Sequence, residues 1–288
     1  MDAHRGGVEF ESGLKNFTCA CSDGAEVAFA FDGWKAIPER WFAWPRRELG
    51  HPRGTIINGV PVRTRVTWIL LSLAFAVPAL AQIAPSAAEL QAYRGLHAAA
   101  AKGDNAEIEK LVKSGAPIDA RDGHARTPLH VAAFMHKPDA ARMLIQLGAD
   151  ANALEAQQYD IVTIAAVADD VPMLKAALAG GGKATNITSP YQGTALIAAA
   201  HLGHDEVVRT LIAAKAPLDH VNNLGWTALI ESIVLGNGGK RHVAVLKALV
   251  EAGANVNLAD RSGDTPLTLA KKRGYSAMVK ILEAAGAR

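Results

Sequence analysis

Histidine is the residue type in this sequence that is best suited to bind a metal ion or to transfer protons. All of the histidines except His4 and His51 lie from residue 82 onward. His201 and His204 are three residues apart, and two imidazoles at that spacing on a helix can share one zinc ion. No third ligand stands at a recognisable spacing from them. We therefore predict that the chain holds no metal site.

Nucleophiles and paired acids are equally sparse. Cys19 and Cys21 are the only cysteines, and because no further ligand cluster accompanies them, we expect no metal or redox site there. Asp169 and Asp170 adjoin each other, but they fall in a predicted turn, where two solvated acids are ordinary. No nucleophile elbow, phosphate loop or paired-carboxylate motif occurs. We predict no catalytic residues, no cofactor and no enzymatic activity; an enzymatic role would have to involve the two neighbouring histidines.

The elements that carry these residues repeat along the chain. An aliphatic residue recurs at spacings of 33, 33, 34, 33 and 38 residues, and a second series, which is mostly glycine, has the same periodicity. The aliphatic series consists of Leu96, Leu129, Val162, Leu196, Leu229 and Leu267, and the second series of Gly115, Gly148, Gly181, Lys215, Gly253 and Gly286. Agreement of the two series predicts a repeat array in which each unit buries its apolar face against its neighbours.

Each unit has the local signals of two helices. Small residues such as Ala132 and Ala133 allow first helices to approach closely, and pairs such as Leu-Ile at residues 144–145 fill the space between neighbours. Threonine accepts hydrogen bonds from unpaired amides at a helix start, and proline at the first helical position loses no needed donor, as at residues 127–128. Glycine ends the second helix, and the Asp/Asn-rich run behind it favours a turn, as at residues 253–257.

The most specific stretch is Thr-Pro-Leu-His-Val-Ala-Ala at residues 127–133, followed by Gly-Ala-Asp-Ala-Asn at residues 148–152. These residues resemble the ankyrin repeat. The resemblance implies an all-α fold, an ankyrin-repeat solenoid of about six helix-turn-helix units with projecting β-hairpin loops, and it implies that His97 and His130 bond to loop backbone. The repeats would span about residues 93–125, 126–158, 159–192, 193–224, 225–262 and 263–288, within a domain at residues 82–288.

Both ends of the array differ from its middle. Lys271 and Glu283 stand where the second unit has Ala133 and Ile145, which makes the last face polar, as a terminal cap requires. The run Ser-Ala-Ala-Glu at residues 86–89 has the pattern of a capping box for a slightly extended first helix. We therefore expect the array to be complete over about residues 88–288.

Two internal units depart from the pattern. The third has Asp160 in place of the usual threonine and Pro172 near its second helix, so we expect reduced local stability there. The fifth has an insertion around residues 236–240, which predicts a lengthened surface loop. Because glycines expose backbone amides and Lys240 and Arg241 follow them, an anion-binding site at these two residues is an alternative.

An export signal precedes the array. Arg63 and Arg65 stand before an apolar run at residues 66–77, and Ala-Leu-Ala at residues 79–81 forms a cleavage pattern before Gln82. This layout predicts a signal peptide at residues 60–81, a true translation start near residue 60, and a doubtful or disordered leader at residues 1–59. The alternative is an uncleaved membrane anchor at residues 66–84, although the run is short for a bilayer. Either topology places the repeats outside the cytoplasm, in the periplasm, secreted or anchored.

The charge balance argues against nucleic acid as a partner. The formal net charge is +2, and from residue 82 onward 21 Lys/Arg face 20 Asp/Glu, a difference of +1. Ankyrin-like proteins bind other proteins through hairpin tips and the concave face of the first helices. The candidate contacts are Arg121, Arg126, Tyr159, Tyr191, Leu224 and Arg261.

From these patterns we expect an exported, non-enzymatic protein-binding scaffold that neutralises a toxin or holds an envelope enzyme. The alternative is a membrane-anchored array that organises an envelope complex, with membrane contact only if residues 66–84 are retained.

Overall fold

The computed structural model describes residues 17–20, 26–29 and 82–288. The predicted signal peptide at residues 60–81 lies outside these ranges. The chain divides into two compact units, residues 1–72 and residues 73–288, and each is described by itself. Within the described ranges, no helix is both long enough and apolar enough to cross a membrane.

The first unit contains an antiparallel strand pair. β1 (Phe17–Ala20) pairs with β2 (Glu26–Phe29), and Cys19 lies opposite Val27. This pairing departs from our expectation of a leader without regular structure. Aromatic and β-branched residues in both segments favour strands, and the Asp-Gly sequence at residues 23–24 is a strong local signal for a hairpin.

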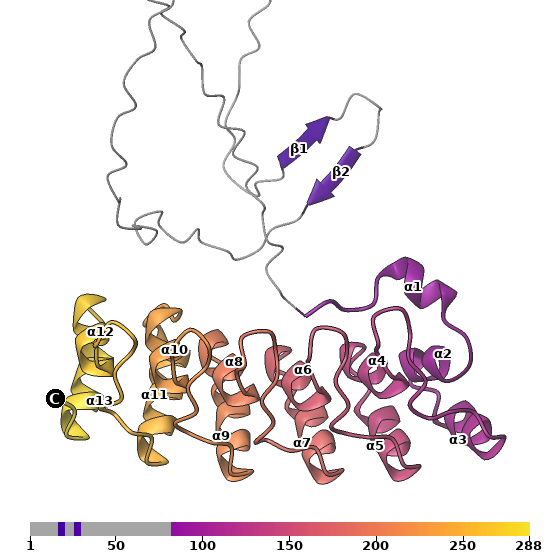
Figure 1. Cartoon of the computed structure of the whole chain (residues 1–288). Coiled ribbons are helices and arrows are strands. Elements are labelled where there is room, and N and C mark those ends of the chain that lie inside the picture. The colour runs from indigo at the N-terminus through magenta and orange to yellow at the C-terminus, as the bar shows by residue number, and fades with distance from the viewer. Residues whose placement is uncertain (1–16, 21–25, 30–81) are drawn as a thin grey trace, which may run out of the picture. The chain divides into compact units, whose positions relative to one another are not determined.

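The second unit is a stack of helix pairs (Figure 1). A short helix, α1 (Ala87–Ala92), precedes the first pair. The pairs are α2 (Gly95–Lys102) with α3 (Asn105–Lys113), α4 (Pro128–Phe134) with α5 (Pro138–Gln146), α6 (Ile161–Val167) with α7 (Val171–Ala179), α8 (Ala195–Leu202) with α9 (Asp205–Ala213), α10 (Ala228–Val234) with α11 (Lys240–Glu251), and α12 (Pro266–Lys272) with α13 (Ser276–Ala284). The first helices form one layer and the second helices the other (Figure 1). This arrangement confirms the predicted solenoid of helix-turn-helix units.

Threonine begins four of the first helices, as the sequence predicts. The Oγ1 atom of Thr127 accepts the amide of His130 at 3.4 Å. Thr194, Thr227 and Thr265 cap α8, α10 and α12 in the same way. Proline follows the threonine in α4 and α12 and occupies the first turn of each helix. The unpaired amides of these helix starts are thus satisfied by local sequence alone.

The third repeat is capped by a different residue. Asp160 Oδ1 accepts the amide of Thr163 at 2.8 Å, and Asn186 Nδ2 donates to Asp160 Oδ2 at 2.9 Å. Pro172 lies in the first turn of α7, where its missing N–H removes no helical hydrogen bond. Local contacts thus accommodate both of the residues that suggested reduced stability, and the stability of the third repeat stays a prediction.

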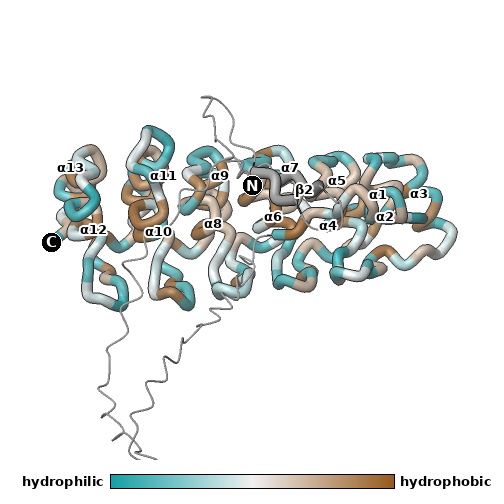
Figure 2. The backbone as a smooth tube through the Cα atoms, turned by 90° about the horizontal axis from the view of Figure 1, so that it is seen from above, coloured by the Kyte–Doolittle hydropathy of each residue, from teal (hydrophilic) through white to brown (hydrophobic). Residues whose placement is uncertain are grey.

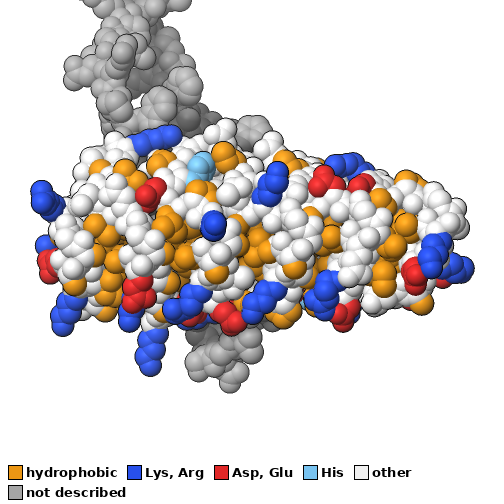
Figure 3. Space-filling model, turned by 90° about the horizontal axis from the view of Figure 1, so that it is seen from below, with side chains coloured by type: hydrophobic (Ala, Val, Ile, Leu, Met, Phe, Trp, Pro, Cys, Tyr) orange, Lys and Arg blue, Asp and Glu red, His pale blue; other side chains and the backbone are white. Residues whose placement is uncertain are grey.

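The core lies between the two helix layers. The six aliphatic residues of the repeat series have exposed fractions of only 0% to 7%. Ala132 and Ala133 are also buried, which lets neighbouring first helices pack closely. Figure 2 shows the hydrophobic stretches along the helices, and Figure 3 shows apolar side chains along the middle of one face with most charged groups toward its borders. Each repeat therefore depends on its neighbours for burial.

Both ends of the stack carry the predicted polar features. The amide of Ser86 donates to Glu89 Oε2 at 2.8 Å, and the amide of Glu89 donates to Ser86 Oγ at 3.3 Å. This capping box begins the separate helix α1 rather than an extended first repeat helix, because the backbone at residues 93–94 is not helical. At the other end, Lys271 Nζ lies 2.9 Å from Glu283 Oε1, and both side chains are exposed.

The insertion in the fifth repeat mainly lengthens a helix. α11 has 12 residues, whereas α5, α7, α9 and α13 have 9. Tyr275 Oη in the next repeat donates to the carbonyl oxygen of Gly236 at 2.9 Å, so the turn before α11 is packed rather than open. The lengthened surface loop that we predicted is thus in large part additional helix.

Candidate partner-binding surface

One polar side chain at the start of each of four tips fixes the shape of the turn. In the tip at residues 121–126, Asp122 Oδ1 accepts the amides of His124 and Arg126, both at 2.9 Å. The same pattern recurs with Glu155, Asn222 and Asp260. In the tip at residues 187–192, an antiparallel bridge between Thr188 and Gly193 closes the turn instead. Each of the five tips is therefore held by hydrogen bonds to its own backbone amides.

Neighbouring tips are hydrogen-bonded to one another. Backbone bonds of 2.8 to 2.9 Å run from the amide of Ala156 to the carbonyl of His124, from Ser189 to Gln158 and from Asn223 to Tyr191. The guanidinium of Arg121 also donates to the carbonyl oxygen of Leu154 at 2.7 Å. Four successive tips thus form one continuous, preorganised edge.

Large apolar side chains are exposed on three consecutive tips of this edge. They are Leu154 (38% exposed), Ile187 (59%), Tyr191 (40%), Val221 (49%) and Leu224 (41%), and we call these five residues the tip ridge. Exposed apolar groups that gather on a rigid surface are typical of protein-interaction sites. Leu202 and Leu235 are exposed as well, but they lie at the C-terminal ends of α8 and α10, away from the tips.

The structure divides the six predicted contact residues into two groups. Four lie exposed on tips: Arg121, Tyr191, Leu224 and Arg261. Arg126 and Tyr159, in contrast, are 0% and 6% exposed, so a partner cannot contact them directly, and their inclusion was wrong. Sequence reasoning missed Leu154, Ile187 and Val221, whose spacings of 33 and 34 residues were the available signal.

Arg126 holds α1 and the preceding segment on the array. Its Nε donates to Asp122 Oδ2 at 2.7 Å, and its guanidinium pairs with Glu89 of α1. It also donates to the carbonyl oxygen of Ile83 at 3.3 Å. Burial would raise the pKa of Asp122, but hydrogen bonds from Tyr93 and Arg126 lower it to about 2. Arg126, which we predicted to contact a partner, thus stabilises the array internally instead.

Two histidines at equivalent repeat positions bond to loop backbone. His97 Nε2 lies 3.0 Å from the carbonyl oxygen of Arg126. His130 Nε2 lies 3.1 Å from the carbonyl oxygen of Ala153, and the amide of Thr127 donates to His130 Nδ1. Burial lowers the pKa of His130 to about 4, so its imidazole is neutral at pH 7. Both contacts confirm the role that the ankyrin resemblance implied.

The histidines considered as metal ligands have separate partners. His204 Nδ1 lies 2.9 Å from the carbonyl oxygen of Ala166, whereas His201 Nδ1 lies 3.8 Å from Glu231 Oε2. His242 Nε2 lies 2.9 Å from the carbonyl oxygen of His201. In the part of the chain that the structure describes, no three His, Cys, Asp or Glu side chains are arranged to hold a metal ion.

Glu231 is a carboxylate at a core position. It has the register in α10 that Val131 has in α4 and Ile164 has in α6, and it is 3% exposed. Asn222 Nδ2 donates to its Oε1 at 2.9 Å, while its buried Oε2 has no hydrogen-bond partner. Burial raises the pKa of Glu231 to about 7.

The structure gives Arg241 carboxylate partners within the chain. Its guanidinium lies 2.6 Å from Asp169 Oδ2 and 3.6 Å from Asp205 Oδ1. Because Asp169 belongs to the third repeat and Asp205 to the fourth, Arg241 connects three repeats. Its charge is already compensated by these carboxylates, which leaves Lys240, exposed at the start of α11, as the remaining cation of the predicted pair. The predicted anion-binding pair is therefore not supported by this geometry.

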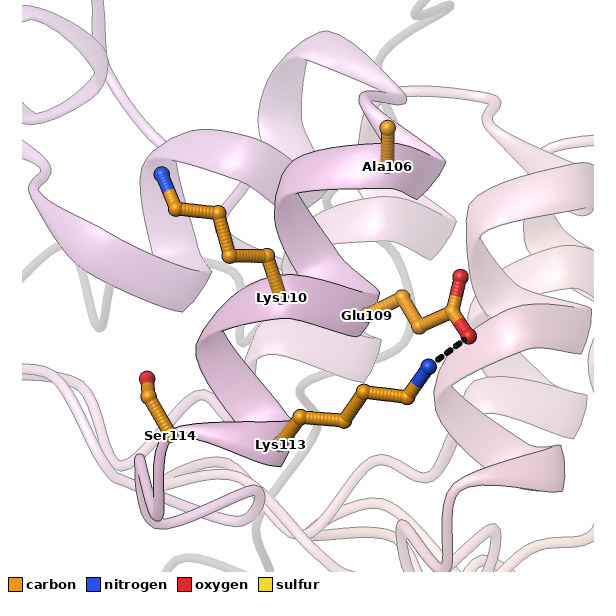
Figure 4. Close-up of a pocket in the computed structure, with 5 residues that line it drawn as sticks. All are labelled: Ala106, Glu109, Lys110, Lys113 and Ser114. Atoms are coloured by element: carbon orange, nitrogen blue, oxygen red, sulfur yellow. Dashed lines mark hydrogen bonds and ion pairs between the residues drawn. The ribbon is translucent and has the colours of Figure 1, made fainter.

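Two cavities lie along the described part of the array. A surface hollow of about 480 Å³ on α3 is lined by Ala106, Glu109, Lys110, Lys113 and Ser114 (Figure 4). All five residues come from α3 and its C-terminal cap, and Lys113 pairs with Glu109 at 2.6 Å. A smaller cavity of about 270 Å³ lies where residues 82–84 meet α4 and α6.

Comparison with known proteins identifies the repeats. A family model of ankyrin repeats in three copies matches residues 162–260, and a model of ankyrin repeats in many copies matches residues 96–145. The ankyrin repeat protein YahD of Escherichia coli (strain K12) is 32% identical over 190 residues, which cover 66% of this chain and 94% of YahD. Human ankyrin repeat and SOCS box protein 16 is 30% identical over 66% of this chain, but the match spans only 42% of that protein.

A solved structure leads to the same family. The crystal structure of an ankyrin repeat domain from Acinetobacter baumannii AYE has a TM-score of 0.64 and 46% identity, covering 67% of this chain and 98% of that domain. Ankyrin repeats suggest a protein-binding scaffold, and proteins built from them are generally non-enzymatic. From its repeat period, its helix caps and these matches, the chain belongs to the ankyrin-repeat family.

Proposed function

We propose that the chain is an exported protein-binding module that recognises another protein through the tip ridge. The observation that carries this proposal is the exposure of five large apolar side chains on three consecutive tips. Covering them with a partner would remove apolar surface from water, which is the dominant favourable term in protein association. Because the tips are already bonded to one another, little further ordering opposes binding.

Exposed arginines flank the tip ridge. Arg121 lies on the tip before the ridge and Arg261 on the tip after it. An apolar centre with a polar border is the usual organisation of a protein interface. The surface therefore favours a partner that presents an apolar patch bordered by acidic groups.

Export is supported by the layout of the sequence before the repeats. In the structure, Gln82 and Ala84 line a cavity against α4 and α6, so a retained apolar segment would have to end before Gln82. This position disfavours the alternative anchor at residues 66–84. We favour cleavage after Ala81 and a location in the periplasm or outside the cell, where the module would neutralise a toxin or hold an envelope enzyme.

Paired variants test the proposed surface. Tyr191→Ala with Leu224→Ala removes two ridge side chains, and Leu202→Ala with Leu235→Ala removes two equally exposed side chains outside the ridge. Crosslinking in intact cells, followed by mass spectrometry of the purified C-terminally tagged protein, measures the yield of partner. We expect the first pair to reduce the crosslinked partner at least about tenfold, since central aromatic and apolar contacts dominate interfaces, and the second pair to leave it unchanged. Equal yields from both pairs would contradict the proposal.

A further inference from the structure

Residues 82–85 form an N-terminal strap over the first helices of the second and third repeats. Pro85 is buried, and the carbonyl oxygen of Ile83 accepts a hydrogen bond from Arg126 at 3.3 Å. Because Arg126 is itself fully buried and paired with Glu89, the downstream end of the strap is fixed. The first residue of the strap, Gln82, is therefore held close to α4 and α6.

Gln82 lies in surroundings that suit its side-chain amide poorly. With Ala84 it lines the cavity of about 270 Å³, whose other walls are the apolar Phe134, Ile164, Val167 and Ala168 together with the polar His136. The side-chain nitrogen of Gln82 is buried and has no hydrogen-bond partner. A buried donor without a partner is unfavourable in these mostly apolar surroundings.

We propose that Gln82 is a modification site, and that it cyclises to pyroglutamate once it becomes the amino terminus. This inference rests on the proposed export with cleavage after Ala81. The uncharged α-amino nitrogen attacks the side-chain amide carbon, and a carbon–nitrogen bond forms that closes a five-membered lactam. The bond from that carbon to the side-chain nitrogen breaks. The nitrogen takes up the proton released by the amine and leaves as ammonia, so no oxidant or co-reactant is required.

The lactam matches the cavity better than the open residue does. Cyclisation removes the side-chain nitrogen that has no partner, and it replaces a titratable amine with a neutral amide. The ring nitrogen keeps one N–H, as the peptide nitrogen of Gln82 does within the longer chain. The bond between Ile83 and Arg126 does not involve the modified atoms. The modification therefore leaves the strap in place and converts its terminal amine into a neutral lactam amide.

Amine labelling of the native protein tests the modification. The C-terminally tagged protein is purified from cells, its free amines are methylated before digestion, and the tryptic peptide of residues 82–94 is analysed by mass spectrometry. We expect a peptide that carries no label on its terminal nitrogen and is lighter than the linear peptide by one ammonia. The Gln82→Ala variant, which cannot cyclise, should be fully labelled.

The outcomes separate the modification from export. A labelled, linear peptide that begins at Gln82 would overturn the modification while supporting cleavage after Ala81. A chain that begins upstream of Gln82 would overturn both. Labelling before digestion excludes cyclisation that occurs only during digestion and later handling.

A second measurement tests whether the ring occupies the cavity. Pyroglutamyl aminopeptidase is added to the folded protein, and release of the terminal residue is followed. Ala168→Lys places a charged side chain at the cavity wall, and Leu235→Lys makes the equivalent change in the fifth repeat, away from the strap. We expect release about tenfold faster in the first variant, because the strap must open before cleavage, and no change in the second. Equal rates in both variants would overturn the docking of the ring.

Discussion

Replacing Glu231 with glutamine tests the energetic reasoning most sharply. The substitution keeps the size of the side chain and the oxygen that accepts the hydrogen bond from Asn222, but it removes the ability to ionise. The nearest titratable group is His201, whose Nδ1 lies 3.8 Å from Glu231 Oε2. Burial, together with His242 and His204, lowers the pKa of His201, so at neutral pH its imidazole does not supply a full compensating charge.

The magnitude follows from the two pKa values of Glu231. The carboxyl has its ordinary value of 4.5 in the unfolded chain and about 7 in the folded protein. Between these values the folded protein binds more protons, so the free energy of unfolding falls as the pH rises. This pKa difference of about 2.5 means that ionisation of Glu231 lowers the free energy of unfolding by about 3 kcal/mol above pH 8. For a domain of this size, that is a change in Tm of roughly 6 to 12 °C.

Urea unfolding of both proteins, at about pH 4 and about pH 8.5, provides the assay. We expect Glu231→Gln to be more stable than the wild-type protein by about 3 kcal/mol at the higher pH, and the advantage to vanish at the lower pH. Comparing the two proteins at each pH cancels the contributions of groups such as His130, which titrate in both proteins, to the free energy of unfolding. An advantage of the same size at both pH values would refute the reasoning.

Three further substitutions test the internal contacts. Arg126→Met should lower the free energy of unfolding in urea by about 3 kcal/mol, because it leaves the carboxylates of Glu89 and Asp122 without their cation. In the same variant, the amide hydrogens of α1 should exchange faster. Gly225→Ala should cost about 1 to 3 kcal/mol in the same assay, since Gly225 has a φ of +85° and an added Cβ would lie 2.5 Å from Arg261 Cγ. His130→Phe should cost about 2 kcal/mol, because carbonyl oxygens that the imidazole contacts lose their donor, and calorimetry at pH 7 measures the loss.

Local signals were sufficient to predict most of the fold. The period of about 33 residues, the threonine caps and the glycine stops all act within one repeat, and each repeat then has only its neighbours to pack against. Even the exception at Asp160 follows a local rule, because aspartate is as good a cap as threonine. The separate helix α1 was missed because its end depends on the non-helical backbone at residues 93–94 rather than on its cap.

The candidate site was harder to predict because exposure is a long-range property. Arg126 and Asp122 stand in a tip, yet Arg126 is buried by a segment 43 residues earlier in the chain. Leu154, Ile187 and Val221 recur with the period of the core residues, so periodicity alone could not show that they face solvent.

The central claim is that the tip ridge binds a partner protein, and site-directed photocrosslinking tests it most directly. A photoreactive residue is placed at Leu224 in the tip ridge or at Leu235 outside it, two positions of similar exposure, and the tagged proteins are irradiated in intact cells. The account predicts one saturable protein adduct from Leu224 and none from Leu235. An adduct only from Leu235, or equal adducts from both positions, would contradict it.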